Sequence, residues 1–240
     1  MNTWQKYLAE VFGTLVLVGI GTGSILAALA TDTPLQAAVP LGFGLALLVG
    51  LYSVGEVSGG HFNPAVTLAA FLDGRINFGD LVGYWISQFA GAMLGSWFVA
   101  ILVSREAVAR TMTVPGDVAD LGNGQAFFGE VLFTTVFVFL ILSVTKSGMA
   151  KQAFLAISMG YAAVHFIGFP LTGASVNPAR SFAPFVIADV ASRDGGQLLL
   201  VYIAGPLIGA IVGWVLYKII VTGDLDFRDD FKDVQDAVTD

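Results

Sequence analysis

Two copies of one short segment are the residues of this sequence that point most directly to a function. They are Asn63-Pro64-Ala65 and Asn177-Pro178-Ala179. Asn is among the best residues for capping the start of a helix, and Pro at the first helical position wastes no N–H donor. Each segment therefore predicts a helix that begins at its Asn, whose amide lies beside the positive end of the helix dipole.

The helices that follow these two segments are short. They are predicted over Ala65–Leu72 and Ala179–Ala188, whereas about 20 residues are needed to cross a bilayer. We therefore expect two half-helices that enter the membrane from opposite faces, so that their N-termini meet near its centre. Such a centre offers amide N–H donors to a water molecule, and its positive potential repels cations and protons.

Two acidic residues also lie in otherwise apolar stretches. Glu10 and Glu130 occupy corresponding positions in the two halves of the chain. A bare carboxylate in lipid costs about 3 kcal/mol or more, but carboxylates accept backbone N–H bonds well. We therefore expect the pair to brace the loops that lead into the half-helices. No nucleophile accompanies them, and a chain with no Cys and two His is poorly suited to bind a metal. The sequence predicts no catalytic residue, metal or cofactor.

The elements that must position these residues are membrane spans. The 240 residues are 56% hydrophobic and 12% charged, with a mean hydropathy of +0.79, whereas soluble domains carry about 25% charged residues. Five uncharged stretches are long enough to cross a bilayer, and a sixth contains a single charge. The six are Val11–Ala30, Pro34–Gly55, Leu81–Val103, Gln125–Thr145, Gln152–Pro170 and Gly195–Tyr217. These features predict an all-α, multi-pass membrane protein.

The two halves of the chain are similar in sequence. Ser58–Ala65 aligns with Thr172–Ala179 at an offset of 114 residues, and Glu10–Thr14 aligns with Glu130–Thr134 at an offset of 120. Each half holds three spans, which is an odd number, so the second half must enter the membrane from the opposite side. This inverted repeat places a functional site at the midplane. We expect the first repeat over 1–110, the second over 111–222 and an acidic tail over 223–240.

The charges predict the orientation. Six spans put both termini on one side, and seven Lys and Arg residues fall on that side against four on the other. The positive-inside rule then makes both termini cytoplasmic, in a plasma or inner cell membrane. The net charge is -7, of which -5 lies in the tail from Asp224 to Asp240. This acidity argues against nucleic acid as a partner.

The residues around the two Asn-Pro-Ala segments resemble the aquaporins, or major intrinsic proteins. The matching stretches are Ser58-Gly59-Gly60-His61-Phe62-Asn63-Pro64-Ala65-Val66-Thr67 and Ser175-Val176-Asn177-Pro178-Ala179-Arg180-Ser181. The resemblance covers nearly the whole chain except the acidic tail. It implies six tilted transmembrane helices plus two re-entrant half-helices, usually in a homotetramer with one pore per subunit.

The aquaporin family narrows its pore on the outer side of the two Asn residues. The resemblance places four residues there, namely Phe43, His165, Ala174 and Arg180. Phe43 with His165 is similar to the water-selective members, whereas glycerol facilitators tend to have Trp and Gly at these positions and Asp after the Arg. Here Ser181 follows the Arg. Arg180 keeps its charge, and beside a His it forms a small polar ring that suits water better than a three-carbon polyol.

Four further residues bear on the resemblance to the family. His61 is expected to shape the inner approach to the pore, where its family counterparts offer backbone carbonyls. Glu56 stands where members often have His. It either lines the inner vestibule, as a proton sensor or cation site, or points to solvent. Phe185 and Ile203 match neither the water-selective nor the glycerol-conducting subgroup.

The leading hypothesis is a passive water channel that conducts in single file and excludes protons and ions. A facilitator for glycerol or small neutral solutes is the alternative within the same class. An ion-coupled secondary transporter also uses inverted repeats and broken helices, but it needs an embedded charge that cycles, for which Glu56 is the only uncommitted candidate. A non-conducting scaffold is a third class, which no feature of the sequence favours. The expected partners are the lipid bilayer and the permeating molecule.

Overall fold

The computed structural model describes residues 2–116, 121–148, 151–189 and 194–224. The predicted acidic tail lies outside these residues beyond Asp224. Every regular element in the described residues is helical, and six spans are long and apolar enough to cross a membrane. The elements are α1 (Thr3–Ala30), α2 (Leu35–Ser58), α3 (Pro64–Leu72), α4 (Phe78–Leu102), α5 (Arg105–Ala109), α6 (Asn123–Val144), α7 (Lys151–Thr172), α8 (Pro178–Ile187), α9 (Gly195–Gln197), η1 (Leu198–Ala204), α10 (Gly205–Tyr217) and η2 (Lys218–Thr222).

The predicted spans and half-helices agree with the structure to within a few residues at nearly every end. The exception is α1, which begins at Thr3, before the predicted start, and so includes Lys6 and Glu10. The half-helices α3 and α8 begin at Pro64 and Pro178, directly after their Asn caps. They have nine and ten residues. At about 1.5 Å per residue, each is about half as long as the hydrocarbon core is thick.

Two features of the helices were not predicted. The sixth span runs over Gly195–Thr222 as α9, η1, α10 and η2 in succession, and η1 and η2 are π-helical. Mean hydropathy does not distinguish a π-helical turn from an α-helical one, so the sequence predicted one uniform helix. The short helix α5 follows α4, and the Ser104 hydroxyl caps it by accepting the Ala107 N–H at 3.0 Å.

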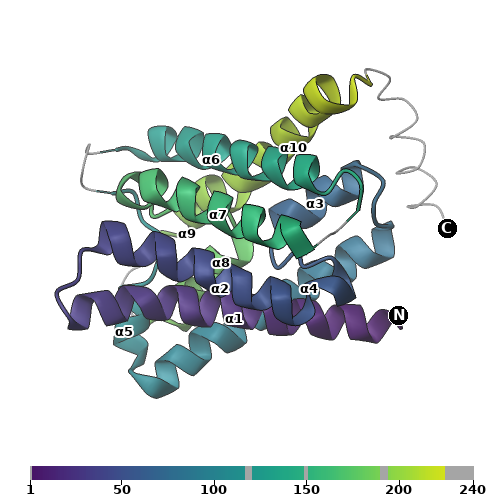
Figure 1. Cartoon of the computed structure of the whole chain (residues 1–240). Coiled ribbons are helices and arrows are strands. Elements are labelled where there is room, and N and C mark those ends of the chain that lie inside the picture. The colour runs from purple at the N-terminus through teal and green to yellow at the C-terminus, as the bar shows by residue number, and fades with distance from the viewer. Residues whose placement is uncertain (1, 117–120, 149–150, 190–193, 225–240) are drawn as a thin grey trace.

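The helices pack in the same pattern in the two halves of the chain (Figure 1). α1 contacts α2 and α4, and α6 correspondingly contacts α7 and α10. Each half-helix packs against a span of the other half, because α3 packs against α10 and α8 packs against α4. The last span of one half therefore supports the half-helix of the other. The start of α1 and the end of α10 lie on the same side of the molecule, as an even number of spans requires.

Glycines allow the spans to approach one another closely. A Cβ added at Gly91 of α4 would lie 3.0 Å from Thr14 Cβ of α1, and one added at Gly209 of α10 would lie 2.8 Å from Thr134 Cβ of α6. Lipid supplies no hydrophobic drive between helices, so close packing of small residues is what stabilises such crossings. The same crossing thus occurs at corresponding places in both halves.

Candidate functional site

The two Asn residues of the repeated segments lie together in the interior. Asn63 is 2% exposed and Asn177 is fully buried. Asn63 Nδ2 donates to the carbonyl of Val176 at 2.8 Å, and Asn177 Nδ2 donates to the carbonyl of Phe62 at 2.9 Å. A side-chain amide nitrogen carries two N–H donors. Among the described residues each amide uses one of them in this way, which leaves its second N–H.

Each Asn also caps the half-helix that follows it. Asn63 Oδ1 accepts the Ala65 N–H at 2.9 Å, and Asn177 Oδ1 accepts the N–H groups of Ala179 at 3.0 Å and Arg180 at 3.3 Å. These bonds hold the oxygen of each amide at the first turn of its own helix, while the nitrogen points to the opposite loop. The nitrogens therefore lie beside two helix N-termini, each carrying about half a positive charge.

A buried carboxylate holds each loop that leads into an Asn. Glu10 accepts two consecutive backbone N–H groups, those of His61 at 3.0 Å and Phe62 at 2.7 Å. Glu130 does the same for residues 175–176, at 2.9 and 2.7 Å. Both carboxylates are fully buried. Their polar contacts place both carboxylates beside the loops.

The two loops need such support because their backbones are strained. Phe62 has φ 50° and Val176 has φ 53°. A residue other than Gly is uncommon in this left-handed region, and a β-branched one is rarer still. The bonds to Glu10 and Glu130 hold the N–H groups of these two residues. Their carbonyls are then directed at the Asn of the opposite loop.

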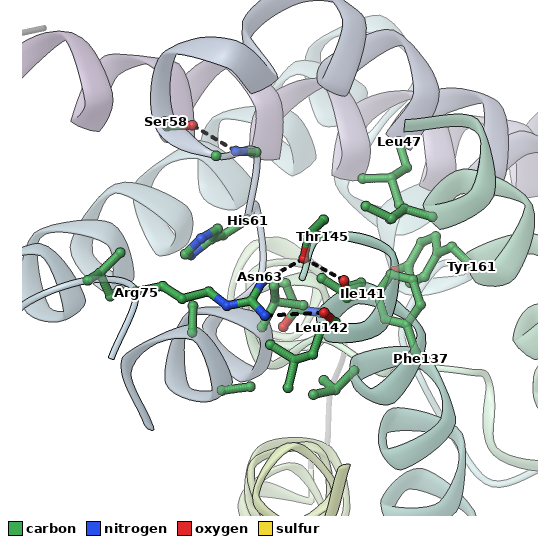
Figure 2. A pocket seen from close by; sticks show the side chains of 18 of the residues that line it. Leu47, Ser58, His61, Asn63, Arg75, Phe137, Ile141, Leu142, Thr145 and Tyr161 are labelled. Atoms are coloured by element: carbon green, nitrogen blue, oxygen red, sulfur yellow. Dashed lines mark hydrogen bonds between the residues drawn. The ribbon is translucent and has the colours of Figure 1, made fainter. Parts of the chain in front are cut away.

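A cavity of about 380 Å³ leads to Asn63 from one side of the bundle (Figure 2). Its mouth lies where α6 ends, beside Arg75 and Thr145, and Asn63 lies on its wall. His61 also lines it, and its Nδ1 lies 3.1 Å from Thr67 Oγ1. The remaining wall is mainly apolar. A small molecule can therefore reach the first Asn from this side without displacing the protein.

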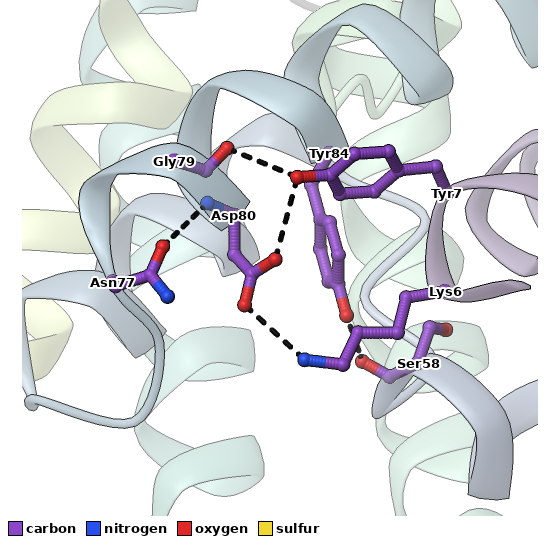
Figure 3. A network of polar contacts seen from close by, with 7 residues as sticks. All are labelled: Lys6, Tyr7, Ser58, Asn77, Gly79, Asp80 and Tyr84. Atoms are coloured by element: carbon purple, nitrogen blue, oxygen red, sulfur yellow. Dashed lines mark hydrogen bonds and ion pairs between the residues drawn. The ribbon is translucent and has the colours of Figure 1, made fainter. Parts of the chain in front are cut away.

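A separate polar network holds the start of α1 against α4 (Figure 3). Lys6 Nζ lies 3.3 Å from Asp80 Oδ2, and Tyr7 OH donates to Asp80 Oδ1 at 3.4 Å. Next to them, Tyr84 OH donates to the carbonyl of Ser58 at 2.7 Å. Ser58 is the last residue of α2, so the neighbouring tyrosine fixes the point from which the first loop starts.

The residues predicted to form the outer constriction come from three helices and one loop. Phe43 lies on α2, His165 on α7, Ala174 in the second loop and Arg180 in the first turn of α8. All four are at most 1% exposed. The rings of Phe43 and His165 stack with centroids 4.8 Å apart, and Arg180 Cζ lies 5.0 Å from the Phe43 centroid. This cation–π contact orients the guanidinium beside the imidazole.

Two buried polar atoms of these four residues have no hydrogen-bond partner among the described residues. His165 Nδ1 lies 2.8 Å from the Tyr161 carbonyl. A carbonyl only accepts, so Nδ1 carries a proton and Nε2 of the neutral ring is an acceptor. Arg180 Nη1 donates to the Thr111 carbonyl at 3.0 Å. The two atoms are His165 Nε2, which is an acceptor, and Arg180 Nε, which is a donor.

Glu56 lies away from this path. Its side chain is 62% exposed, and its Oε1 lies 3.6 Å from Lys151 Nζ at the surface. Of the two predicted alternatives, this geometry favours the one that points to solvent. In the described part of the chain, no group of three His, Cys, Asp or Glu side chains is placed to hold a metal ion.

Three residues of the site were not predicted. Gln88 Nε2 donates to Glu10 at 2.7 Å, and Arg75 lies at the cavity mouth, where it donates to the end of α6. Tyr161 lines the deep part of the cavity, one helical turn before His165. That four-residue spacing was a usable signal for Tyr161. The sequence held none for the other two, because their partners lie far along the chain.

This chain is similar to known proteins over most of its length. The family model described as Major intrinsic protein matches residues 1–217. Glycerol uptake facilitator protein-like 6 of Lactiplantibacillus plantarum is 40% identical over 210 residues, covering 87% of this chain and 94% of that protein. Aquaporin Z of Brucella melitensis is 36% identical over 228 residues, covering 89% and 96%.

A solved structure is similar to this chain in its fold. The aquaglyceroporin from Plasmodium falciparum superposes with a TM-score of 0.80 at 20% identity, covering 92% of this chain and 98% of that one. The family model spans most of the chain, and the relatives exceed 30% identity over most of their length. This chain therefore belongs to the major intrinsic protein family, a family of multi-pass membrane channels with the aquaporin fold.

Proposed function

We propose that this chain is a passive channel through which water crosses the membrane in single file. The observation that carries the proposal is the packing of Phe43 on both His165 and Arg180, at 4.8 and 5.0 Å. Such close packing favours a small permeating molecule over a larger one. The acceptor His165 Nε2 and the donor Arg180 Nε complement a water molecule, which both donates and accepts.

The opposed Asn amides supply the exclusion of protons and ions. A water between Asn63 and Asn177 receives N–H donors on its oxygen and meets two positive helix ends. It is then poorly placed to accept a proton from the next water in the file. The fixed charge of Arg180 adds a second barrier to cations.

A facilitator for glycerol or other small neutral solutes is the second candidate. The name of the Lactiplantibacillus plantarum relative favours it, as does the mainly apolar wall of the 380 Å³ cavity, which suits the carbon chain of a polyol. The name of the Brucella melitensis relative favours water. We place water first because the outer ring is both polar and closely packed.

Stopped-flow light scattering on proteoliposomes tests both candidates. Shrinkage in an impermeant osmolyte measures water permeability, and swelling in a glycerol gradient measures glycerol permeability. We expect water permeability well above that of empty liposomes and glycerol permeability close to theirs. Water movement no faster than in empty liposomes would refute the proposal, and rapid glycerol entry with slow water movement would establish the second candidate.

An ion-coupled transporter is the candidate function that the side chains support least. Glu10 and Glu130 are engaged by backbone N–H groups, and Glu56 is paired with Lys151 at the surface. None of these is an uncommitted charge inside the bundle. Flux that saturates with substrate and responds to a proton gradient would nevertheless be the signature of this class, and the same vesicles can be used to look for it.

We further propose the assembly and orientation of the channel. It is a homotetramer with one pore per subunit in the cell membrane, with both termini cytoplasmic. The matched roles of Glu10 and Glu130 support division into inverted repeats over 1–110 and 111–222, followed by the acidic tail over 223–240. Light scattering of the detergent-solubilised protein measures its mass, and protease cleavage of the tail in oriented vesicles reports its side.

A further inference from the structure

Tyr161 is a buried tyrosine that the mechanism above does not use. It lies on α7, is 1% exposed and lines the 380 Å³ cavity. It is the eleventh residue of a helix that starts on the side of the cavity mouth. At about 1.5 Å per residue, it lies about 15 Å deep, near the middle of the bilayer. Tyr161 therefore lines the same cavity as Asn63 and lies one helical turn before His165 of the predicted outer constriction.

Aromatic neighbours fix the ring of Tyr161 in one position. Its centroid lies 4.9 Å from that of Phe137 on α6, 6.3 Å from that of Phe43 on α2 and 4.3 Å from that of His165 on the next turn. In Figure 2, Tyr161 and Phe137 lie together on one wall, across from Arg75. The ring therefore has little freedom to leave the lumen, and it contacts two members of the outer constriction.

The hydroxyl of Tyr161 differs from those of two other buried tyrosines. Tyr84 OH donates to the carbonyl of Ser58 at 2.7 Å, and Tyr202 OH donates to the carbonyl of Thr172 at 2.9 Å. Among the described residues, Tyr161 OH has no hydrogen-bond partner. A buried hydroxyl without a partner is unfavourable, so such groups usually bind a protein atom or a water molecule. Because Tyr161 also lines the cavity, we infer that a water molecule in the cavity is the partner of this hydroxyl.

We propose that Tyr161 is a further specificity-determining residue of the pore. Its ring narrows the lumen directly inside the constriction formed by Phe43, His165 and Arg180, and its hydroxyl binds the permeating water there. The proposal rests on the proposed water channel. It adds a second narrow section to the pore, in which the Tyr161 hydroxyl is the group that binds water on an otherwise aromatic wall.

Two substitutions separate the roles of the hydroxyl and the ring. Tyr161→Phe keeps the ring, so we expect water permeability to fall by about two- to ten-fold, the effect of one hydrogen bond, with glycerol still excluded. Tyr161→Val removes the ring, so we expect glycerol permeability to rise by about ten-fold or more. Tyr52→Phe is the matched control, because Tyr52 is 56% exposed on the outside of the bundle, and it should conduct as wild type.

The outcomes distinguish this proposal from the proposed function. A wild-type protein that conducts no water refutes the water channel itself. Wild-type water permeability in Tyr161→Phe, together with unchanged glycerol exclusion in Tyr161→Val, overturns the role of Tyr161 while leaving the channel intact. Circular dichroism and the protein content of the vesicles verify that each variant is folded and inserted.

A structural measurement tests the hydroxyl independently of flux. We expect an experimental map at high resolution to contain an ordered water within about 3 Å of Tyr161 Oη. We expect Tyr161→Phe to lose this water while the rings of Phe43 and Phe137 stay in place. A hydroxyl that instead donates to a protein carbonyl would overturn the proposal.

Discussion

The side-chain amides of Asn63 and Asn177 are bonded crosswise, because each donates to the carbonyl of the residue that precedes the other. The two bonds measure 2.8 and 2.9 Å and join Asn63 to Val176 and Asn177 to Phe62. They link residues 113 and 115 positions apart. These bonds hold the N-termini of the two half-helices opposite one another. The same Nδ2 nitrogens carry the N–H groups that we propose to bind water.

Replacing one of these amides tests their role in conduction. Asn63→Asp keeps an oxygen that accepts the Ala65 N–H, but it loses both N–H donors and faces the Val176 carbonyl with a like-charged oxygen. We expect lower water permeability and a measurable cation leak, because the positive potential is reduced. Proteoliposomes loaded with a pH-sensitive dye report the leak of protons. Tight vesicles with normal water permeability would show that the second Asn suffices.

Arg180 is predicted to be the main barrier at the outer constriction. Arg180→Val removes the fixed charge and opens space beside Phe43, so we expect glycerol and proton permeability to rise. Lowering a barrier by about 1.4 kcal/mol raises a rate about ten-fold, and we expect a change of at least this size. Arg110→Ala is the control, because Arg110 is exposed at the surface. Unchanged selectivity in Arg180→Val would place the whole barrier at the Asn pair.

The two bracing carboxylates should differ in their effect on stability. Glu10 accepts from Ser58, His61, Phe62 and Gln88, whereas Glu130 accepts from three donors. Each oxygen of Glu10 accepts from two donors. In Glu10→Gln the amide nitrogen therefore faces two of them, so we expect a loss of about 1.5–3 kcal/mol or more. We expect a smaller loss in Glu130→Gln.

Thermal unfolding in detergent measures these losses. The exposed Glu106 on α5 provides the control, since Glu106→Gln touches neither loop. Equal melting temperatures for Glu10→Gln and wild type would mean that the loops hold their strained backbones without the carboxylate.

The close helix crossings give a prediction about glycine. In Gly209→Ala, the new Cβ would meet the Val131 carbonyl oxygen at 2.5 Å, so we expect destabilisation of about 1–3 kcal/mol. Gly124→Ala in α6 meets no atom within 4 Å. We expect it to leave stability unchanged or slightly raised, because Ala is the better helix former. Melting curves that move in the same direction for both variants would contradict the packing argument.

The absence of cysteine makes mercury a probe of the pore. The sequence holds no Cys, so we expect mercuric chloride to leave water permeability unchanged. Ala174→Cys places one thiol beside the outer constriction, where Ala174 is fully buried, and we expect mercury to block this variant. Full conduction by the treated variant would remove Ala174 from the proposed path. Block of the wild type would contradict the pore model or indicate an effect of mercury that involves no thiol.

The sequence by itself determined the elements. Apolar stretches of sufficient length predicted six spans, and Asn followed by Pro predicted where both half-helices begin, because capping is a local property of a few neighbouring residues. The positions of Glu10 and Glu130 in the repeat predicted that they act alike. Their bonds to the N–H groups of the two loops have the same pattern.

The tertiary structure alone decided which groups face the lumen. Tyr161 lies on a predicted span and Glu56 directly follows one, but only packing shows that the first lines the cavity and the second pairs with Lys151 outside it. Hydropathy predicts that a helix is buried in a membrane but not which of its faces meets another helix. Contacts such as that of Arg180 with Phe43 join residues far apart in the chain, and no local pattern specifies them.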